Sequence, residues 1–194
     1  DASPSHATTA IPHQDATFKR RLRDSLCGLG LTQVQSLTLS NEKDQFTFPR
    51  WQSEGNPTLI SNPITQDHTM LRQSVLPSLL RLLAANRHHE LPQRIYEVGT
   101  TVRNHHNKDR VSWLCAENIS SFANCRGMVQ AFLRDLGVDS SSSQIEWGDM
   151  PVQHGPWMKG RSSQIFINGE MVGEMGEIGP EVGALFELRV PLHG

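Results

Sequence analysis

The segment Asn62–Arg103, NPITQDHTMLRQSVLPSLLRLLAANRHHELPQRIYEVGTTVR, carries most of the information about the fold of this chain. After a polar turn, it predicts a leucine-rich helix over Val75–Glu90, with Ser74 as its cap and Pro77 in its first turn. The predicted core face of this helix consists of Leu76, Leu79, Leu80 and Leu83. A compact strand over Arg94–Val102 follows the helix. A helix followed directly by a strand indicates a sheet with helices packed on it.

The rest of the chain extends this pattern. We predict further helices over Thr17–Leu29, Ser121–Leu136 and a short run from Pro180, and further strands over Gln33–Ser40, Val111–Ala116, Glu146–Trp147, Gln164–Asn168 and Met171–Ile178. Asn168-Gly169, between the last two strands, is a strong hairpin signal. Residues 1–14 are small and polar and are predicted to form a linker or arm, which leaves 15–194 as one domain. The mixture of elements predicts an α+β domain with an antiparallel sheet flanked by helices.

Composition excludes several classes of protein. The chain has 194 residues, with 18 Lys and Arg against 20 Asp and Glu, so no global basic field indicates nucleic-acid binding. Its three cysteines, Cys27, Cys115 and Cys125, lack CxxC spacing and are expected to be reduced thiols. No apolar run approaches the ~20 residues that a membrane span requires. The absence of an initiator methionine suggests a piece of a longer protein.

Two further segments complete a pattern that can be compared with known families. One is SFANCRGMVQAFLRDLGVD, and the other is Gly160–Leu192, GRSSQIFINGEMVGEMGEIGPEVGALFELRVPL. The second segment contains Arg161, Asn168-Gly169, Gly173, Gly176, Pro180-Glu181-Val182 and Phe186-Glu187-Leu188 in order. From about Thr17 onwards, the chain resembles the catalytic-core-like module of the phenylalanyl-tRNA synthetase beta subunit. That family implies a class II aminoacyl-tRNA synthetase-like fold, with the chain stopping where the family begins its last strand.

The resemblance places the first class II motif, a helix and strand that build the subunit interface. Thr17–Leu29 and Gln33–Ser40 occupy its position. The interface candidates that follow are Phe18, Arg20, Leu22, Arg23, Leu26 and Thr38. A helix can also bury such an apolar stripe within its own domain, and this alternative stays open.

The other two motifs bear on catalysis. In the family, the second motif ends in an arginine that grips the substrate carboxylate and α-phosphate, and Arg103 occupies that position here. The third motif supplies an arginine to the γ-phosphate, but the corresponding Gly176–Ala184 has none and carries Glu177 and Glu181. Adenylate formation needs cations around the triphosphate, and losing one such group costs a few kcal/mol of barrier, on the order of several hundredfold in rate. The sequence therefore predicts a vestigial pocket without catalytic residues.

The resemblance implies a non-catalytic structural module of phenylalanine–tRNA ligase. This module would pair with the catalytic alpha subunit in a heterotetramer of two alpha and two beta subunits, located in the cytoplasm. The parent enzyme would use ATP and magnesium to join phenylalanine to tRNA, with no cofactor in this domain. Two alternatives remain: a stand-alone protein-interaction domain derived from a synthetase, and an active class II adenylate-forming ligase.

Three other patterns allow competing interpretations. The pairs His88-His89 and His105-His106, with Cys115 and Cys125, suggest a metal site, but they lack zinc-ligand spacing, so we expect none. The Gly173–Gly179 run resembles a phosphate-binding loop, although strand glycines that allow close packing explain it better. A third pattern is a possible basic strip for tRNA phosphates, formed by Arg72, Arg81, Arg87 and Arg94, for which solvated helix charges are the favoured alternative.

Overall fold

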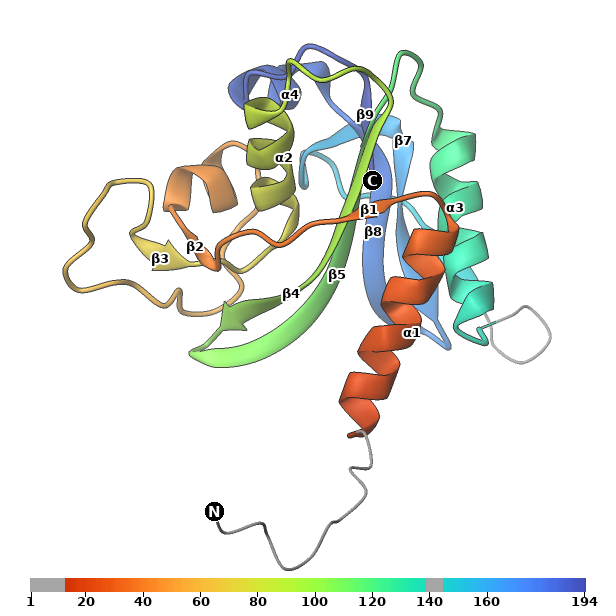
Figure 1. Ribbon diagram of the computed structural model, residues 1–194, viewed down its shortest axis with the longest axis horizontal. Helices are drawn as coiled ribbons and strands as arrows, with labels where there is room; N and C mark the ends of the chain where they lie inside the picture. Colours follow the sequence, from red (N-terminus) through yellow and green to blue (C-terminus); the bar gives the residue numbers. More distant parts are fainter. Residues whose placement is uncertain (1–12, 139–144) are drawn as a thin grey trace, which may run out of the picture.

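A mixed sheet forms the centre of the computed structural model, which describes residues 13–138 and 145–194. Its seven strands run in the order β1-β4-β5-β9-β8-β7-β6 (Figure 1). They are β1 Thr32–Gln33, β4 Gln93–Arg103, β5 His106–Ala116, β9 Leu192–His193, β8 Glu170–Ile178, β7 Trp157–Ile167 and β6 Ile145–Gly148. β1 is parallel to β4, and the other neighbouring pairs are antiparallel. The α+β prediction is confirmed, with one parallel pair that it did not include.

Helices cover both faces of this sheet, as Figure 1 shows. Helices α2 (Leu76–Ala85) and α4 (Pro180–Leu185) lie on one face, and α1 (Gln14–Gly28) and α3 (Phe122–Asp135) lie on the other. The α2–α4 core is built mainly from Val75, Leu76, Leu79, Leu80, Leu83, Ile95, Leu114, Ile178, Val182 and Phe186. The α1–α3 core is built mainly from Leu22, Leu26, Tyr96, Trp113, Cys125, Val129, Phe132, Leu133 and Met175. The predicted core face of the leucine-rich helix is confirmed.

Two hairpins have tight, left-handed tips. Asn104 and His105 join β4 to β5 with φ of 50° and 62°, and Asn168 and Gly169 join β7 to β8 with φ of 52° and 82°. Positive φ at both central residues is the type I′ geometry that matches the twist of the flanking strands. The Asn168-Gly169 hairpin prediction is confirmed. β5 begins at His106, earlier than predicted, because its polar first half pairs with β4, for example Thr101 with Lys108.

The predicted strand Gln33–Ser40 is wrong as a single element. Its start, β1, joins the large sheet, whereas its end forms β2 (Leu39–Ser40), which pairs with β3 (Met70–Leu71) in a separate small sheet. Between them, the Ser36 amide and hydroxyl both donate to Glu97 Oε2, so this segment leaves the large sheet. Leu37, in the middle of this segment, is 62% exposed and packs on neither sheet as a core residue. A single turn of π-helix, η1 (Lys43–Thr47), follows β2.

Helix α2 is shorter than the predicted Val75–Glu90. Val75 is its N-cap residue and makes no side-chain cap bond, so Ser74 lies one residue too early to cap the helix; the Ser74 amide instead donates to Gln45 Oε1 of η1. At the other end, the Asn86 side-chain amide donates to the Leu82 carbonyl, and the helix stops at Ala85. α1, α3 and α4 confirm the remaining helix predictions, whereas most of the predicted N-terminal arm lies outside the described residues. In the described parts of the chain, every helix is too short or too polar to cross a bilayer.

Candidate functional site

Arg103 ends β4, and its guanidinium is already occupied. Nη1 forms an ion pair with Glu54, and Nε and Nη2 both donate to the Gln73 carbonyl at 3.3 Å. Burial, helped by nearby Arg110, lowers the pKa of this guanidinium. A substrate carboxylate or phosphate would have to displace Glu54 before it could bind here. The residue at the second-motif position therefore acts as a structural contact between β4 and the segments that precede and follow β3.

The segment from β8 to α4 carries the two carboxylates that replace the expected arginine. Glu177 is buried at the end of β8, where its carboxylate accepts from the Phe122 amide at 2.8 Å and pairs with Arg161 Nη1 at 3.1 Å. Glu181, on α4, pairs with Arg50 at 3.1 Å. Both charges are thus compensated by arginines from other elements, so their repulsion of a triphosphate is weaker than the sequence suggests. Those arginines are in turn engaged by the carboxylates.

Each of the four arginines considered as a basic strip pairs with a carboxylate, which argues against the strip. Arg72 is fully buried against Glu97, and the other pairs are Arg81–Asp44, Arg87–Glu187 and Arg94–Glu117. The hydrogen bond to Asp44 raises the pKa of Arg81. A guanidinium that is neutralised in this way contributes little to an electrostatic surface for phosphates. Gly173 and Gly176 are strand glycines of β8, but only Gly176 requires close packing: a side chain there would collide with the Arg161–Ser162 backbone, whereas one at Gly173 would meet Ile165 at an ordinary 3.7 Å.

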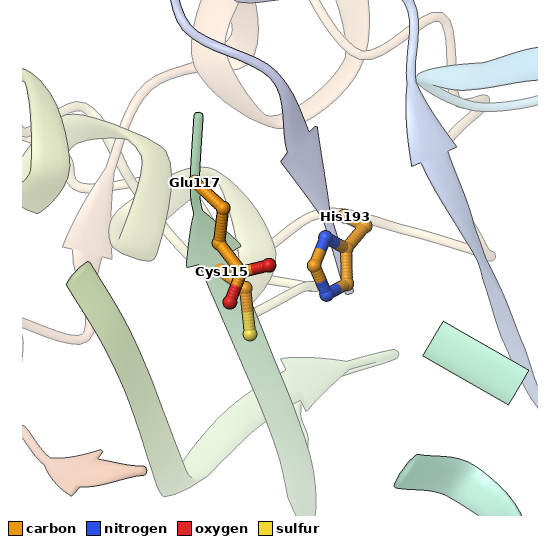
Figure 2. Close-up of side chains that lie close together, drawn as sticks. All are labelled: Cys115, Glu117 and His193. Atoms are coloured by element: carbon orange, nitrogen blue, oxygen red, sulfur yellow. The ribbon is translucent and has the colours of Figure 1, made fainter. Parts of the chain in front are cut away.

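A compact group of three potential ligands lies where β5 meets β9. Cys115 and His193 are directly opposite each other in the β5–β9 ladder, and Glu117 follows the last residue of β5. Figure 2 shows their three side chains turned toward one another. One ligand atom from each residue lies within 4.8 Å of the other two. Cys115 and His193 are almost fully buried, and Glu117 is 9% exposed.

The electrostatics of this cluster follow from its burial. Desolvation raises the pKa of the Cys115 thiol to about 12, with a further contribution from Glu117. Burial also lowers the pKa of His193, against the opposing effect of Glu117. Arg94 Nε donates to Glu117 Oε1 at 2.6 Å, which holds that carboxylate in place. Without a bound cation, the cluster is a neutral thiol and a neutral imidazole beside an ion pair.

A cavity of about 610 Å³ opens beside the cluster, between β8, α4 and the segment after β5. Its walls are mainly apolar, and its charged groups include Arg161, Glu177 and Arg189. Glu177 lines the cavity and is the partner of His193 in the β8–β9 ladder, so the cavity lies at the same end of the central strands as the cluster, although none of the three ligands lines it. The position at which a synthetase-like active site would lie is thus occupied by the Arg161–Glu177 ion pair and by this mainly apolar cavity.

Comparison with known proteins agrees with these observations. The family described as "Phenylalanyl tRNA synthetase beta chain CLM domain" matches residues 2–193. The chain belongs to this family. It is 36% identical to the phenylalanine–tRNA ligase beta subunit of Methanothrix thermoacetophila over 191 residues, which are 98% of this chain and 34% of that protein. The corresponding protein of Archaeoglobus fulgidus is 34% identical over 193 residues, 97% of this chain and 34% of that protein. The chain spans about a third of the length of these relatives.

Within this CLM domain, the six interface candidates, five on α1 and Thr38 just before β2, differ in their burial. Leu22 and Leu26 are buried in the α1–α3 core, and Leu26 has no exposed surface to offer a partner. Phe18 is 51% exposed, and Arg20 is exposed as well. Arg23 and Thr38 are half-buried. The structure therefore does not bring the six candidates together on one surface, because the helix turns its leucines toward the sheet.

The histidine pairs of the CLM domain are not near its cysteines. His105 and His106 lie at the β4–β5 tip, and Cys115 is nine residues further along β5, about 30 Å for an extended strand. His88 and His89 lie in the exposed turn after α2. Sequence reasoning named Cys115 in a metal context but missed Glu117 and His193 as its neighbours. The spacing of these residues along the sequence gave no indication of the cluster, because only the pairing of β5 with β9 brings His193 close to Cys115 and Glu117.

Proposed function

We propose that this chain is a non-catalytic structural module of a phenylalanine–tRNA ligase beta subunit. It has a class II synthetase-like fold and pairs with the catalytic alpha subunit, in a heterotetramer of two alpha and two beta subunits. The assembled enzyme charges tRNA with phenylalanine, using ATP and magnesium held by its other parts. Membership of the CLM family supports the assignment, and the engaged state of Arg103 is the single observation that favours a non-catalytic role.

The charge arrangement argues against adenylate formation. Phosphate-binding arginines stabilise a transition state when they are preorganised and free to meet developing negative charge. Here Arg103 is held by Glu54, and Arg161 is held by Glu177. Releasing Arg161 would leave the buried carboxylate of Glu177 without its partner, whereas Glu54 is 64% exposed and would be solvated by water. The geometry therefore favours a scaffold over an active ligase.

The first experiment tests for activity in the isolated chain. We expect no phenylalanine-dependent ATP–pyrophosphate exchange above a heat-inactivated control. The double variant Arg103→Ala/Arg161→Ala should leave this background unchanged. Exchange that depends on phenylalanine and is lost in the double variant would establish the active-ligase alternative.

A second experiment tests the pairing surface. The exposed end of α1 carries Phe18 and Arg20, which contribute little to the core of their own domain. We expect Phe18→Ser/Arg20→Glu to weaken binding of the alpha subunit from the same genome by at least about tenfold, or ~1.4 kcal/mol. Lys159→Glu, an exposed charge reversal on β7, should bind normally.

The outcome distinguishes the remaining alternatives. Unchanged circular dichroism with lost binding supports the α1 surface. Intact binding by the α1 variant would show that the interface with the alpha subunit lies elsewhere on the domain. A wild-type chain that does not bind the alpha subunit at all would favour the stand-alone interaction domain.

A further inference from the structure

We propose that Cys115, Glu117 and His193 bind one divalent transition-metal ion of the zinc class, held between β5 and β9. This inference is independent of the ligase assignment. It rests on the convergence of three different ligand types at one buried point of the sheet (Figure 2). A thiolate and an imidazole select zinc-like ions over magnesium and calcium, which prefer oxygen ligands alone.

The spacing of the three ligand atoms fits one ion after a small movement. Zinc lies ~2.3 Å from sulfur and ~2.0–2.2 Å from nitrogen and oxygen, so tetrahedral ligands are about 3.4–3.6 Å apart. The three ligand atoms here lie within 4.8 Å of one another. Closing on an ion needs shifts of roughly 1 Å, which side-chain rotations supply. The backbone positions stay fixed, since Cys115 and His193 are already direct partners in the β5–β9 ladder.

The charge balance also suits a divalent ion. Binding displaces the thiol proton to solvent, and the resulting thiolate and the Glu117 carboxylate together neutralise the two positive charges. Arg94, whose charge Glu117 offsets before the ion binds, then leaves the group with one net positive charge, and the Arg94 side chain is 42% exposed, so that charge is partly solvated. Arg94 holds Oε1 of Glu117 from the outer side, which orients the carboxylate and leaves its second oxygen for the ion.

Such an ion would have three protein ligands and one further position. Glu177 is the other carboxylate facing His193, but Arg161 and the Phe122 amide engage it. The fourth position is therefore assigned to water from the adjacent cavity. The ion would tie β9, a strand of two residues, to the much longer β5.

The test is a cobalt titration of the full chain after removal of metals with a chelator. Co²⁺ bound by a thiolate gives a sulfur-to-metal charge-transfer band, and we expect that band to saturate at one ion per chain. Zn²⁺ should displace the cobalt, whereas excess Mg²⁺ should not. We also expect Zn²⁺ to raise the Tm of the wild-type chain. A folded wild-type chain without a saturable band would overturn the proposal.

Variants identify the ligands. Cys115→Ser should abolish the charge-transfer band, whereas Cys125→Ser, which removes the other buried thiol on the same face, should retain it. Glu117→Gln keeps the thiol and should lower the affinity for Co²⁺ at least about tenfold with the band preserved. This second variant decides the matter if Cys115→Ser fails to fold by circular dichroism. A band that persists in Cys115→Ser, or unchanged affinity in Glu117→Gln, would contradict the assignment.

Discussion

Gly99 lies beside a buried ion pair that leaves no room for a side chain. Arg72 and Glu97 are 1% and 3% exposed, and Arg72 Nη2 lies 2.6 Å from Glu97 Oε1. Ser36, Ser78 and the Thr100 carbonyl complete their hydrogen bonds. A Cβ at position 99 would collide with both charged groups. One charged pair thus explains the glycine in the Glu-Val-Gly sequence and joins β3, β4 and the segment after β1.

Removing one partner of this pair should be costly. We expect Arg72→Met to lower the free energy of unfolding by about 3–5 kcal/mol, because Glu97 would remain buried without a counter-charge. Arg87→Met is the matched control, since it breaks an exposed pair with Glu187 worth ~0–1 kcal/mol. Urea unfolding followed by circular dichroism measures both. Similar losses for the two variants would mean that the buried carboxylate finds another partner.

The three cysteines should differ sharply in reactivity. Cys27 is exposed, whereas Cys115 and Cys125 have no exposed surface. We expect one thiol per folded chain to react promptly with Ellman's reagent, and three after denaturation. Cys27→Ser should remove the fast reaction while leaving the fold unchanged. A second fast thiol in the native chain would indicate that β5 or α3 opens readily.

At the scale of elements, a charged contact ties α1 to the sheet. Lys19 Nζ of α1 lies 2.6 Å from Asp109 Oδ2 of β5. The hydrogen bond from Lys19, and then that from Thr100, lowers the pKa of Asp109. A lowered folded pKa gives stability that is present above the ordinary carboxyl pKa and is lost as the pH falls through the folded value.

The lowered pKa of Asp109 leads to a prediction about the pH dependence of stability. Asp109→Asn should lower the Tm relative to wild type at pH 7, and the difference should shrink as the pH falls below ~4. Thermal melts across that pH range, at fixed ionic strength, provide the measurement. Because both side chains are partly exposed, added salt should also reduce the difference at pH 7. A Tm difference that is independent of pH would show that Asp109 stabilises the fold through packing and not through its charge.

The elements were predicted well where local pattern determines them. Leu76, Leu79, Leu80 and Leu83 repeat at helical spacing, and Asn168-Gly169 satisfies a left-handed turn by itself. The prediction failed at Gln33–Ser40, because Glu97 and Arg72 draw Ser36 away from the large sheet. Such a tertiary contact leaves no trace in local periodicity.

The candidate site was predictable only in part, for the same reason. The sequence indicated Arg103 and the missing arginine near Glu177, but it did not indicate that Glu54 and Arg161 neutralise those residues. The leucines of α1 were equally suitable for a partner interface and for the core of their own domain. An amphipathic pattern shows that one face of a helix is apolar, but not whether a partner or the same domain buries that face. Pairing between distant strands also determined the Cys115–Glu117–His193 cluster, which spacing did not reveal.

At the scale of the whole molecule, the described residues form two cores that share the same strands. Adjacent residues Ile95 and Tyr96 of β4 enter opposite cores, as do Leu114 and Trp113 of β5. Neither core can therefore lose its strands without exposing the other, and we infer that the described domain unfolds as one cooperative unit.

Two matched leucines test this coupling. Leu79 of α2 and Leu26 of α1 are both fully buried, on opposite faces of the sheet. We expect Leu79→Ala and Leu26→Ala each to cost about 2–5 kcal/mol and to shift one common urea transition. Tryptophan fluorescence and far-UV circular dichroism should give the same midpoint. Separate midpoints in either variant would show that the two faces unfold independently.

The position of β9 has a consequence for the order in which the sheet is completed. β4 with β5, and β7 with β8, are hairpins with short tips that can form soon after each is synthesised. The two halves of the sheet meet through β9, where Leu192 and His193 pair with β5 and β8 and Gly194 exchanges backbone hydrogen bonds with Gly176. A ribosome synthesises these residues after both hairpins. Until then, β5 in one half of the sheet and β8 in the other lack their β9 partner and have unpaired edges. The closing of this gap, a contact between residues distant along the chain, is therefore expected to be the late step of folding and the interval of greatest exposure to aggregation.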